Sequence, residues 1–476
     1  MSTPPNNRLE LSREQMRAFG YRVIDRIVDH FVSLPDKPVT RMASRSDLEG
    51  RLREPLPERG TDVDRVLDQL ERDVWSKMMH LDHPRFFAFV PSPSNFVSAM
   101  ADALVAGLNP FAGTWLEASG PAQIELVAVD WLRQLTGFPE AAGGHFVTGG
   151  SAANLTALAV ARRVNLDDQS ERAVVYFSDQ THSSIERALK LLGFSRAQMH
   201  KLPADGQFRL PVDELQRAIR NDRAAGKRPF CVVANAGTTN TGAVDPLPLL
   251  AELCAREGLW LHVDGAYGAA AVLSQEGRKR LAGLELADSL SIDPHKWLFQ
   301  PYEIGCVLVR DARFLKQTFH LLPEYLEDTS RAEDEVNFYE RGLQLTRCFR
   351  ALKMWLSLKV FGAAAFRAAV DRGISLAELA EQALRQSSCW EIVSPAQLGI
   401  VAFRFVSEGM SDDAINTLNL RLIEKCLQDG FALVSSTILN GRTVLRLCII
   451  NPRTTDEDVI DTIQRLEQYG QTFRQE

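Results

Sequence analysis

The sequence predicts an α/β fold, with a large domain around a mainly parallel sheet followed by a small C-terminal α+β domain. Three observations predict it. Short apolar segments alternate with helical segments in the middle of the chain, this texture changes near residue 373, and 476 residues suffice for two or three domains. The apolar fraction of 45% and the charged fraction of 24% are those of an ordinary soluble protein.

The first segment, residues 1–90, is predicted to be a helical arm. Ser12 and Gln15 form the pattern of a capping box, in which both side chains bind free backbone N–H groups at a helix start. Apolar residues follow at helical spacing until Pro35 ends the helix: Met16, Phe19, Val23, Ile27, Val28 and Phe31. This apolar face packs either on a partner subunit or within its own chain.

The large domain is predicted at residues 91–372. Helices at 151–163 and 247–257 lie between or before short apolar runs. These runs are typical of strands buried on both faces of a parallel sheet, and they occupy 173–177, 230–234, 259–263 and 306–309. In such a sheet, ligands bind at the carboxyl ends of the strands.

The small domain is predicted at residues 373–476, which is within the usual size of a domain. Its strands are expected at 400–405 and 444–450. Its helices are expected at about 411–428 and 456–469.

Charge and cysteine usage narrow the classes of function. The net charge is −7, with acids and bases interleaved and no basic run, so neither nucleic acid nor an anionic membrane is expected as a partner. No apolar stretch approaches the roughly 20 residues of a membrane span, and the polar start lacks the apolar run of a signal peptide. Seven scattered cysteines without a CxxC pair indicate reduced thiols in the cytoplasm.

A glycine-rich stretch, Thr148–Asn154, opens the helix expected from Ser151. Gly149 and Gly150 let the backbone approach a ligand closely, and free N–H groups at the helix start attract an anion such as phosphate. One alternative is a plain turn capped by Ser151. Another is a serine-hydrolase elbow built on Ser151, which has Ala153 where the second glycine belongs.

Two polar stretches follow predicted strands. In Asp179–Ser184, His182 is suited to stack on an aromatic cofactor and to move protons, although a histidine near a helix start often has no role. In Asn235–Gly242, small hydroxyl residues beside glycine suit a wall that a ligand approaches closely, or simply a polar loop.

An aspartate, Asp264, ends the apolar strand in His262–Tyr267. A buried carboxylate is costly without a cationic partner, and a protonated pyridine nitrogen is such a partner. Ala266 is small enough to let a flat ring lie against it. The alternatives are a metal-ligand pair of His262 with Asp264, or an aspartate that caps a turn.

A lysine, Lys296, follows another apolar strand, in Ser289–Trp297. Desolvation there is expected to lower the pKa of its amine and favour a Schiff base. A surface lysine after a proline turn is the alternative. The order and spacing of the motifs favour the Schiff-base lysine over the surface lysine. Asp264 follows His182 by 82 residues and Lys296 follows Asp264 by 32, so the parts of a cofactor site appear in sequence on successive strand ends. A phosphate cradle, a stacking histidine, a ring aspartate and a Schiff-base lysine predict a pyridoxal 5'-phosphate (PLP) cofactor and no metal.

Longer motifs carry a family resemblance over about residues 8 to 470. The chain resembles the group II PLP-dependent amino-acid decarboxylases, and the closest match is to the aromatic-L-amino-acid decarboxylase branch. The matching stretches are Ser178–Ser184, His262–Tyr267 and Asp293–Trp297, with Pro84–Phe89, Val129–Leu132 and Phe349–Trp355 in agreement. The resemblance implies PLP fold type I, a homodimer with active sites at the interface, and decarboxylation of an aromatic L-amino acid to an amine and CO₂.

The resemblance also implies roles for single residues. Lys296 would hold PLP as a Schiff base, Asp264 would bind the pyridine nitrogen, and His182 would stack on the ring. Ser92 sits where the family has a substrate-side hydroxyl. Ser151, Ala152 and Ala153 would contact the phosphate, and Thr239, Asp293 and His295 would line the cofactor site.

The substrate residues are less sharply defined. Phe89, Phe111 and Trp115 would form an apolar wall for an aromatic side chain, together with Phe86 and Phe87, although aromatic residues usually belong to the core. Gly113 stands where the family has a bulkier residue, which would enlarge the pocket. Diamino-acid and glutamate decarboxylases share much of this frame and remain alternatives.

The family's proton donor to Cα is a tyrosine on a mobile loop. A gapless match places Phe338 there, and a one-residue gap places Tyr339 there. Relatives with phenylalanine at this position are aldehyde synthases, which use O₂ to deaminate oxidatively. We predict Tyr339 as the donor, and His182 favours the decarboxylase. A scaffold without activity is the non-enzyme alternative, which the presence of both Lys296 and Asp264 disfavours.

Overall fold

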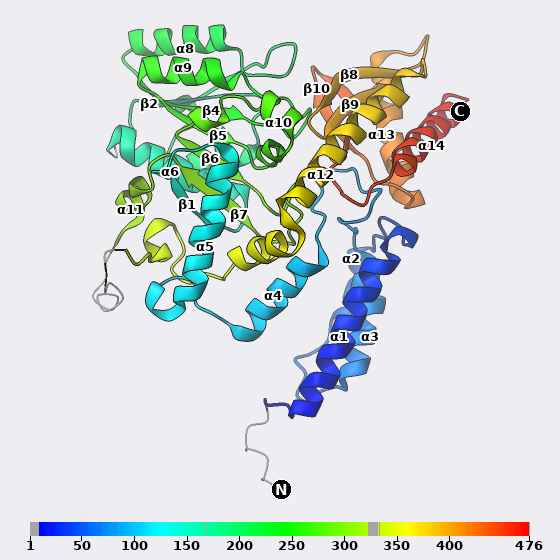
Figure 1. The fold of residues 1–476 in the computed structure, drawn as a ribbon. Coiled ribbons are helices and arrows are strands. Elements are labelled where there is room, and N and C mark those ends of the chain that lie inside the picture. The colour runs from blue at the N-terminus through cyan, green and yellow to red at the C-terminus, as the bar shows by residue number, and fades with distance from the viewer. Residues whose placement is uncertain (1–8, 168, 322–331, 333, 476) are drawn as a thin grey trace.

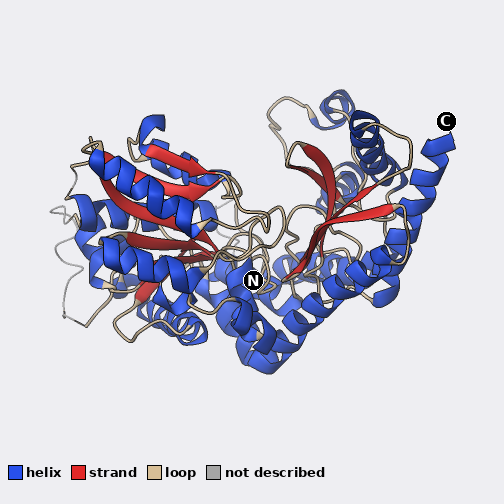
Figure 2. Ribbon diagram, turned by 90° about the horizontal axis from the view of Figure 1, so that it is seen from above, coloured by secondary structure: helices blue, strands red, loops and turns tan. Residues whose placement is uncertain are grey.

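The computed structural model of the protein describes residues 9–167, 169–321, 332 and 334–475. A large lobe and a small lobe each contain one sheet (Figure 2). The first three helices project away from the large lobe (Figure 1). Among the described residues, none of the helices has the length and apolar character needed to span a membrane.

The N-terminal arm begins with the predicted capping box. The Gln15 N–H donates to Ser12 Oγ and the Ser12 N–H donates to Gln15 Oε1, which starts α1 (Arg13–Ser33). Ion pairs of Arg22 with Asp64 and of Arg26 with Asp68 join α1 to α3 (Val63–Asp73), with α2 (Arg45–Leu52) between them in the chain. Within the described structure, α1 contains no buried residue.

The large sheet has seven strands in the order β1-β7-β6-β5-β4-β2-β3. Neighbours pair in parallel from β6 through β3, whereas β7 pairs antiparallel with both β1 and β6. The strands are β1 (Gly143–Val147), β2 (Ala173–Ser178), β3 (Met199–Leu202), β4 (Arg228–Asn235), β5 (Trp260–Asp264), β6 (Ser289–Ile292) and β7 (Gly305–Val309). The mainly parallel sheet is therefore confirmed, with the strand expected at 306–309 as the antiparallel member.

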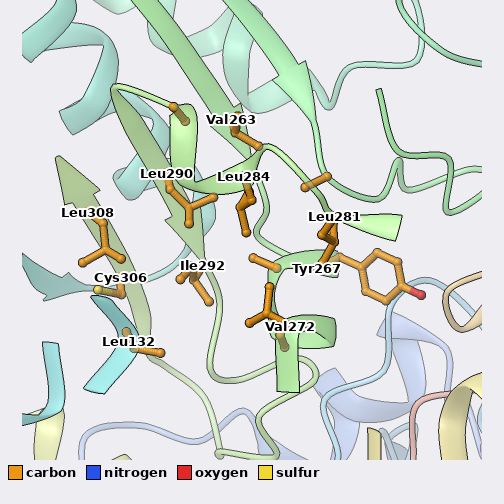
Figure 3. Packing of buried hydrophobic residues seen from close by; sticks show 14 of the residues in the cluster. Leu132, Val263, Tyr267, Val272, Leu281, Leu284, Leu290, Ile292, Cys306 and Leu308 are labelled. Carbon is orange, nitrogen blue, oxygen red and sulfur yellow. The ribbon is translucent and has the colours of Figure 1, made fainter. Parts of the chain in front are cut away.

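Helices cover both faces of this sheet. Alternate residues of β4 belong to different apolar clusters: Val232 packs on one face and Cys231 on the other, as the period of two in a strand requires. Val263, Leu290 and Leu308 belong to the larger cluster (Figure 3). The flanking helices are α4 (Phe96–Leu108), α5 (Trp115–Thr136), α6 (Gly150–Leu166), α7 (Ser183–Leu191), α8 (Val212–Ala224), α9 (Leu247–Glu257), α10 (Gln275–Arg280) and α11 (Arg313–Phe319).

Helix α12 (Ala351–Arg385) connects the two lobes, with a break at Gly362, whose φ is 75°. The helix runs through residue 373, where the texture of the sequence changes. The small lobe carries an antiparallel sheet in the order β10-β11-β9-β8, as predicted for an α+β unit. Its elements are β8 (Trp390–Gln397), β9 (Ile400–Phe405), α13 (Asp412–Asp429), β10 (Ser435–Leu439), β11 (Arg442–Cys448) and α14 (Asp456–Gln475).

Candidate active site

A cavity of about 350 Å³ lies where the predicted motifs meet. Its wall includes the first turn of α6 and residues at or just beyond the ends of β2, β4, β5 and β6. These strands are parallel neighbours, so their carboxyl ends share one edge of the sheet, which is the usual ligand-binding edge of such folds.

The cavity collects most of the cofactor residues expected from the sequence. Those that line it are Ser151, Ala152, His182, Thr239, Asp264, Ala266, Asp293, His295 and Lys296. Ala153 is instead fully buried, and its methyl group packs in the core cluster behind the cavity. Only the backbone N–H of Ala153 is therefore left to contact a phosphate, and this contact stays a prediction.

Asp264 ends β5 and is held by three donors. The Ala266 N–H and the Ser291 hydroxyl donate to Oδ1 at 3.1 Å, and the Asn154 amide donates to Oδ2 at 2.9 Å. Burial alone would raise the pKa of this carboxyl, but the positive charge of Lys296, the neighbouring His262 and the Ala266 N–H outweigh burial and lower the pKa. Asp264 is therefore kept as a carboxylate, the form that can pair with a protonated ring nitrogen.

Lys296 extends from the turn after β6, and its Nζ lies 2.9 Å from Asp293 Oδ2. Burial acts to lower the pKa of the amine, as predicted. The carboxylates of Asp293 and Asp264 act more strongly in the opposite direction, so the net pKa is raised. The expectation of a lowered pKa is therefore wrong for the protein without cofactor, because the sequence did not show that two carboxylates converge on this amine.

The segment that carries Lys296 is anchored by its neighbour. The Trp297 ring stacks on the Tyr267 ring at 5.3 Å between centroids with an interplanar angle of 4°. The Tyr267 hydroxyl in turn accepts a hydrogen bond from the Gly399 N–H of the small lobe at 2.8 Å. Aromatic stacking and this bond fix the turn that presents Lys296 to the cavity.

His182 precedes α7 and accepts the Ser184 N–H through Nδ1 at 3.2 Å. The Ser184 hydroxyl lies 2.8 Å from the same nitrogen. Burial lowers the pKa of His182, and Asp264 opposes this effect only in part. The imidazole is therefore neutral near pH 7, which suits a flat ring that stacks on another.

The glycine-rich turn between β1 and α6 fits a phosphate and a flat ring. A Cβ at Gly150 would lie 2.8 Å from Asp293 Oδ2 and 3.0 Å from the Ala266 methyl, so a side chain there would press on the cavity wall. Gly149 precedes α6 without a side-chain cap among the described residues, which leaves the helix start to an anion. The cavity volume is in the range of small-ligand sites.

Two predicted substrate residues lie outside the described wall of the cavity. The Ser92 hydroxyl is buried and donates to the His295 carbonyl, so it braces the lysine-bearing turn from behind. Phe89 is 58% exposed, with a left-handed φ of 54°, and its N–H donates to Ser435 Oγ. Their contact with substrate stays a prediction.

The other aromatic candidates, Phe111 and Trp115, also lie outside the described lining of the cavity. The Trp115 N–H donates to Asn337 Oδ1 at the start of α5. A Cβ at Gly113 would lie 2.5 Å from the Phe111 ring and 2.7 Å from the Leu345 carbonyl. Within one chain, this glycine therefore permits close packing rather than a larger pocket.

The two candidates for the loop position, Phe338 and Tyr339, lie in a short 3₁₀ helix (Phe338–Arg341) and are both buried. The Arg347 guanidinium lies 4.8 Å from the centre of the Phe338 ring, and the Tyr339 N–H donates to the Gly113 carbonyl at 3.1 Å. Neither belongs to the described wall of the cavity. Tyr339 as proton donor stays a prediction.

Several wall residues were not singled out from the sequence. Most of them lie within the polar motifs described above. The sequence therefore indicated the motif but not which of its side chains would line the cavity. Glu303 carried no such signal, because it reaches the cavity from the segment before β7. The others are Thr148, Asn154, Ser184, Asn235, Gly237, Thr238 and Tyr267, whereas the lining residues Gly149 and Gly150 were expected from the sequence.

The mainly parallel sheet, the small second lobe, and a lysine facing an ionised aspartate across one cavity define the class of fold type I PLP enzymes. Comparisons with known proteins identify the family. Residues 46–406 match the model of the pyridoxal-dependent decarboxylase conserved domain. The chain belongs to this family and is a PLP-dependent decarboxylase, so the hydrolase and scaffold alternatives are wrong.

Individual relatives are similar over nearly the whole chain. An aromatic-L-amino-acid decarboxylase of Bacillus atrophaeus is 50% identical over 461 residues, which is 96% of each chain. A phenylacetaldehyde synthase of Arabidopsis thaliana is 30% identical over 94% of each chain. The crystal structure of Oryza sativa TDC with PLP and tryptamine aligns with a TM-score of 0.93 at 28% identity, covering 99% of this chain and 100% of that one.

Proposed function

We propose that this enzyme decarboxylates an aromatic L-amino acid, of the tryptophan, tyrosine, phenylalanine or DOPA type, to the amine and CO₂. The observation that carries the proposal is the convergence of Lys296, Asp264 and His182 on one cavity, in a chain that is 50% identical to a decarboxylase named for aromatic substrates. When bound, PLP supplies an electron sink for the electron pair left by the departing carboxylate.

The residues of the chain have distinct parts in this proposal. Lys296 would supply the amine that holds the cofactor. Asp264, ionised and held by three donors, would stabilise a positive charge on the cofactor's ring nitrogen. His182 would stack on the ring, and the N–H groups at the start of α6, from Ser151 to Ala153, would bind the phosphate. Orientation and electrostatics are thus the protein's contribution.

The charge of the cavity disfavours acidic substrates. Among the described wall residues, Lys296 is the only lysine or arginine, and Glu303 adds a negative charge. A glutamate-like side chain would meet no spare cation there, which supports an aromatic substrate over the acidic alternative.

The aldehyde-synthase alternative is favoured by one observation, the 30% identical phenylacetaldehyde synthase. A panel of aromatic, acidic and diamino acids, assayed for CO₂, amine, aldehyde and peroxide, separates the candidates. We expect aromatic substrates to yield CO₂ and amine in equal amounts. Aldehyde and peroxide as main products, or faster turnover of glutamate or a diamino acid, would overturn the proposal.

We also propose a homodimer with active sites at its interface. Large apolar side chains are exposed on the helical arm and on α4, where Leu108 is 78% exposed. Burying them against a second copy would place the arm and the turn with Phe111 and Trp115 in an interface. Light scattering should give twice the chain mass of 53.1 kDa, and Leu108→Glu should lower it. A monomeric wild-type protein would contradict this assembly.

We place the enzyme in the cytoplasm, because all seven cysteines are free thiols in the structure and most are buried. Fractionation of the source cells tests this location. Recovery of the enzyme with extracellular proteins would contradict it.

A further inference from the structure

One buried amide, that of Asn154, joins the groups around the cavity. Asn154 lies in the first turns of α6 and is fully buried. Its Nδ2 donates to Asp264 Oδ2 and to Ser184 Oγ, both at 2.9 Å. Its Oδ1 lies 2.9 Å from His262 Nε2. The carboxylate of Asp264 can only accept, so the orientation of this amide is determined by its partners.

The hydrogen bonds that lead to Asn154 have a defined direction. The Trp260 indole N–H can only donate, and it donates to Ser289 Oγ at 2.8 Å. Asn154 Oδ1 can only accept, so Nε2 of His262 is the donor to it, and the Ser289 hydroxyl donates to the other ring nitrogen, Nδ1, at 2.9 Å. Burial lowers the pKa of His262 to about 4, so the ring is neutral and carries its proton on Nε2. That proton goes to Asn154 Oδ1.

Beyond Asn154 the hydrogen bonds divide into two branches. One branch ends on Asp264. In the other, the Ser184 oxygen accepts from Asn154, and its hydroxyl donates to His182 Nδ1 at 2.8 Å. Because Nδ1 of His182 also receives the Ser184 N–H, the neutral ring carries its proton on Nε2.

We propose that Asn154 is a positioning residue for two groups that would hold the cofactor, keeping the Asp264 carboxylate in place and orienting the Ser184 hydroxyl that donates to Nδ1 of His182. This inference rests on the proposed cofactor site. A single amide thereby couples the group that keeps the ring nitrogen charged to the group that stacks on the ring. Such outer partners fix the geometry of the inner residues.

Two variants separate the branches. Asn154→Asp keeps the size of the side chain but sets a second carboxylate against Asp264, so one of the two must take up a proton. Ser184→Ala removes only the branch to His182. Thr156→Val is the matched control, since Thr156 is also buried on α6 and its hydroxyl binds the Ala152 carbonyl instead.

The first measurements are the affinity of the apoenzyme for PLP, the pH titration of the bound cofactor's visible absorbance, and the melting temperature. For Asn154→Asp we expect PLP binding to weaken about tenfold or more and the absorbance titration to shift, because the charge opposite the ring nitrogen is lost. Thr156→Val should bind PLP as the wild type does.

For Ser184→Ala we expect the wild-type absorbance titration but an altered pH profile of kcat/KM, because His182 loses the hydroxyl donor at Nδ1 whereas Asp264 keeps all three of its donors. The charged groups around His182 are Asp264, Lys296, Asp293 and Arg187, and this variant leaves all four in place. Should Asn154→Asp fail to fold, Ser184→Ala still tests the branch.

Two results would overturn the inference: Asn154→Asp with the cofactor affinity and titration of the control, or Ser184→Ala with an unchanged pH profile. A wild-type protein that binds no PLP would instead contradict the proposed function. The two failures are therefore distinguishable.

Discussion

Asp264 and Asp245 are two buried aspartates near the same edge of the sheet, and they differ in the charge around them. Asp264 faces Lys296 and His262, and its pKa is lowered despite its burial. Asp245 accepts the N–H of Leu210 and both the N–H and the side-chain amide of Asn235, at 2.7 to 2.9 Å. Burial nonetheless raises the pKa of Asp245 to about 6.

This difference shows that hydrogen bonds alone do not lower the pKa of a buried carboxyl when no cation is close to it. Each carboxyl receives three donors, yet only Asp264, on which the charge of Lys296 acts, has a lowered pKa. Donors alone do not offset burial at Asp245, whereas opposite charge does so at Asp264. Asp264 is therefore suited to chemistry that needs a fixed negative charge. Asp245 positions Asn235, which lines the cavity.

Lys296→Ala should have the largest effect, because it removes both the cofactor's anchor and the cation that distinguishes Asp264. We expect kcat to fall about a thousandfold or more, with loss of the absorbance of the lysine-bound cofactor. Steady-state kinetics and visible spectra after reconstitution with PLP measure this. Lys279→Ala, at an exposed lysine, is the control and should retain activity. Full activity of Lys296→Ala would refute the assignment.

Asp264→Asn should follow, with kcat lower by roughly a hundredfold or more, because the neutral amide cannot hold a positive charge on the ring nitrogen. The shape of the side chain is retained, so the apoenzyme should still fold. Kinetics and PLP titration check the result. A variant with wild-type kcat would show that the charge of Asp264 is not needed.

Asp245→Asn should instead affect stability, by about 1–3 kcal/mol, because the amide retains one acceptor oxygen and the backbone N–H of either Leu210 or Asn235 loses its acceptor. Activity should remain within a few-fold. Urea unfolding and kinetics of the same preparation measure both quantities. Loss of activity without loss of stability would give Asp245 a role like that of Asp264.

The raised pKa of Asp245 also predicts how the stability of the wild-type protein changes with pH relative to this variant. An acid whose folded pKa of about 6 exceeds its unfolded value of 3.8 contributes stability that is complete below about pH 4 and is lost as the pH rises through 6. The loss is on the order of 3 kcal/mol. The stability gap between wild type and Asp245→Asn should therefore narrow between about pH 4 and about pH 6 and change little at higher pH. A constant gap would mean that Asp245 titrates normally.

Tyr339→Phe should have the smallest effect, because Tyr339 is buried and lies outside the described wall of the cavity. We expect the amine to remain the main product. Measuring the amine, aldehyde and peroxide formed by the variant tests this expectation. Conversion of Tyr339→Phe to an aldehyde-forming enzyme would establish Tyr339 as the proton donor after all.

Much of the site was predictable because its signals are local. Glycines at a helix start and the polar residues that end apolar strands are visible within a few residues, and parallel strands bring their carboxyl ends together. Strand positions were predicted well where runs were strongly apolar, as at β2 and β9. The strands β1, β3, β6, β8 and β10 were not delimited, because they are short or carry polar residues.

The sequence by itself determined the fold class, the cofactor and the strand ends that bear the chemistry, since each depends on short-range patterns repeated in order. Only the tertiary structure decided the charge of Lys296, the role of Asn154 and the position of Tyr339. Asn154 contacts Asp264 across 110 residues of chain, and the charge of Lys296 acts on Asp264 across 32. Burial and the sign of neighbouring charges depend on such contacts, and no local pattern encodes them.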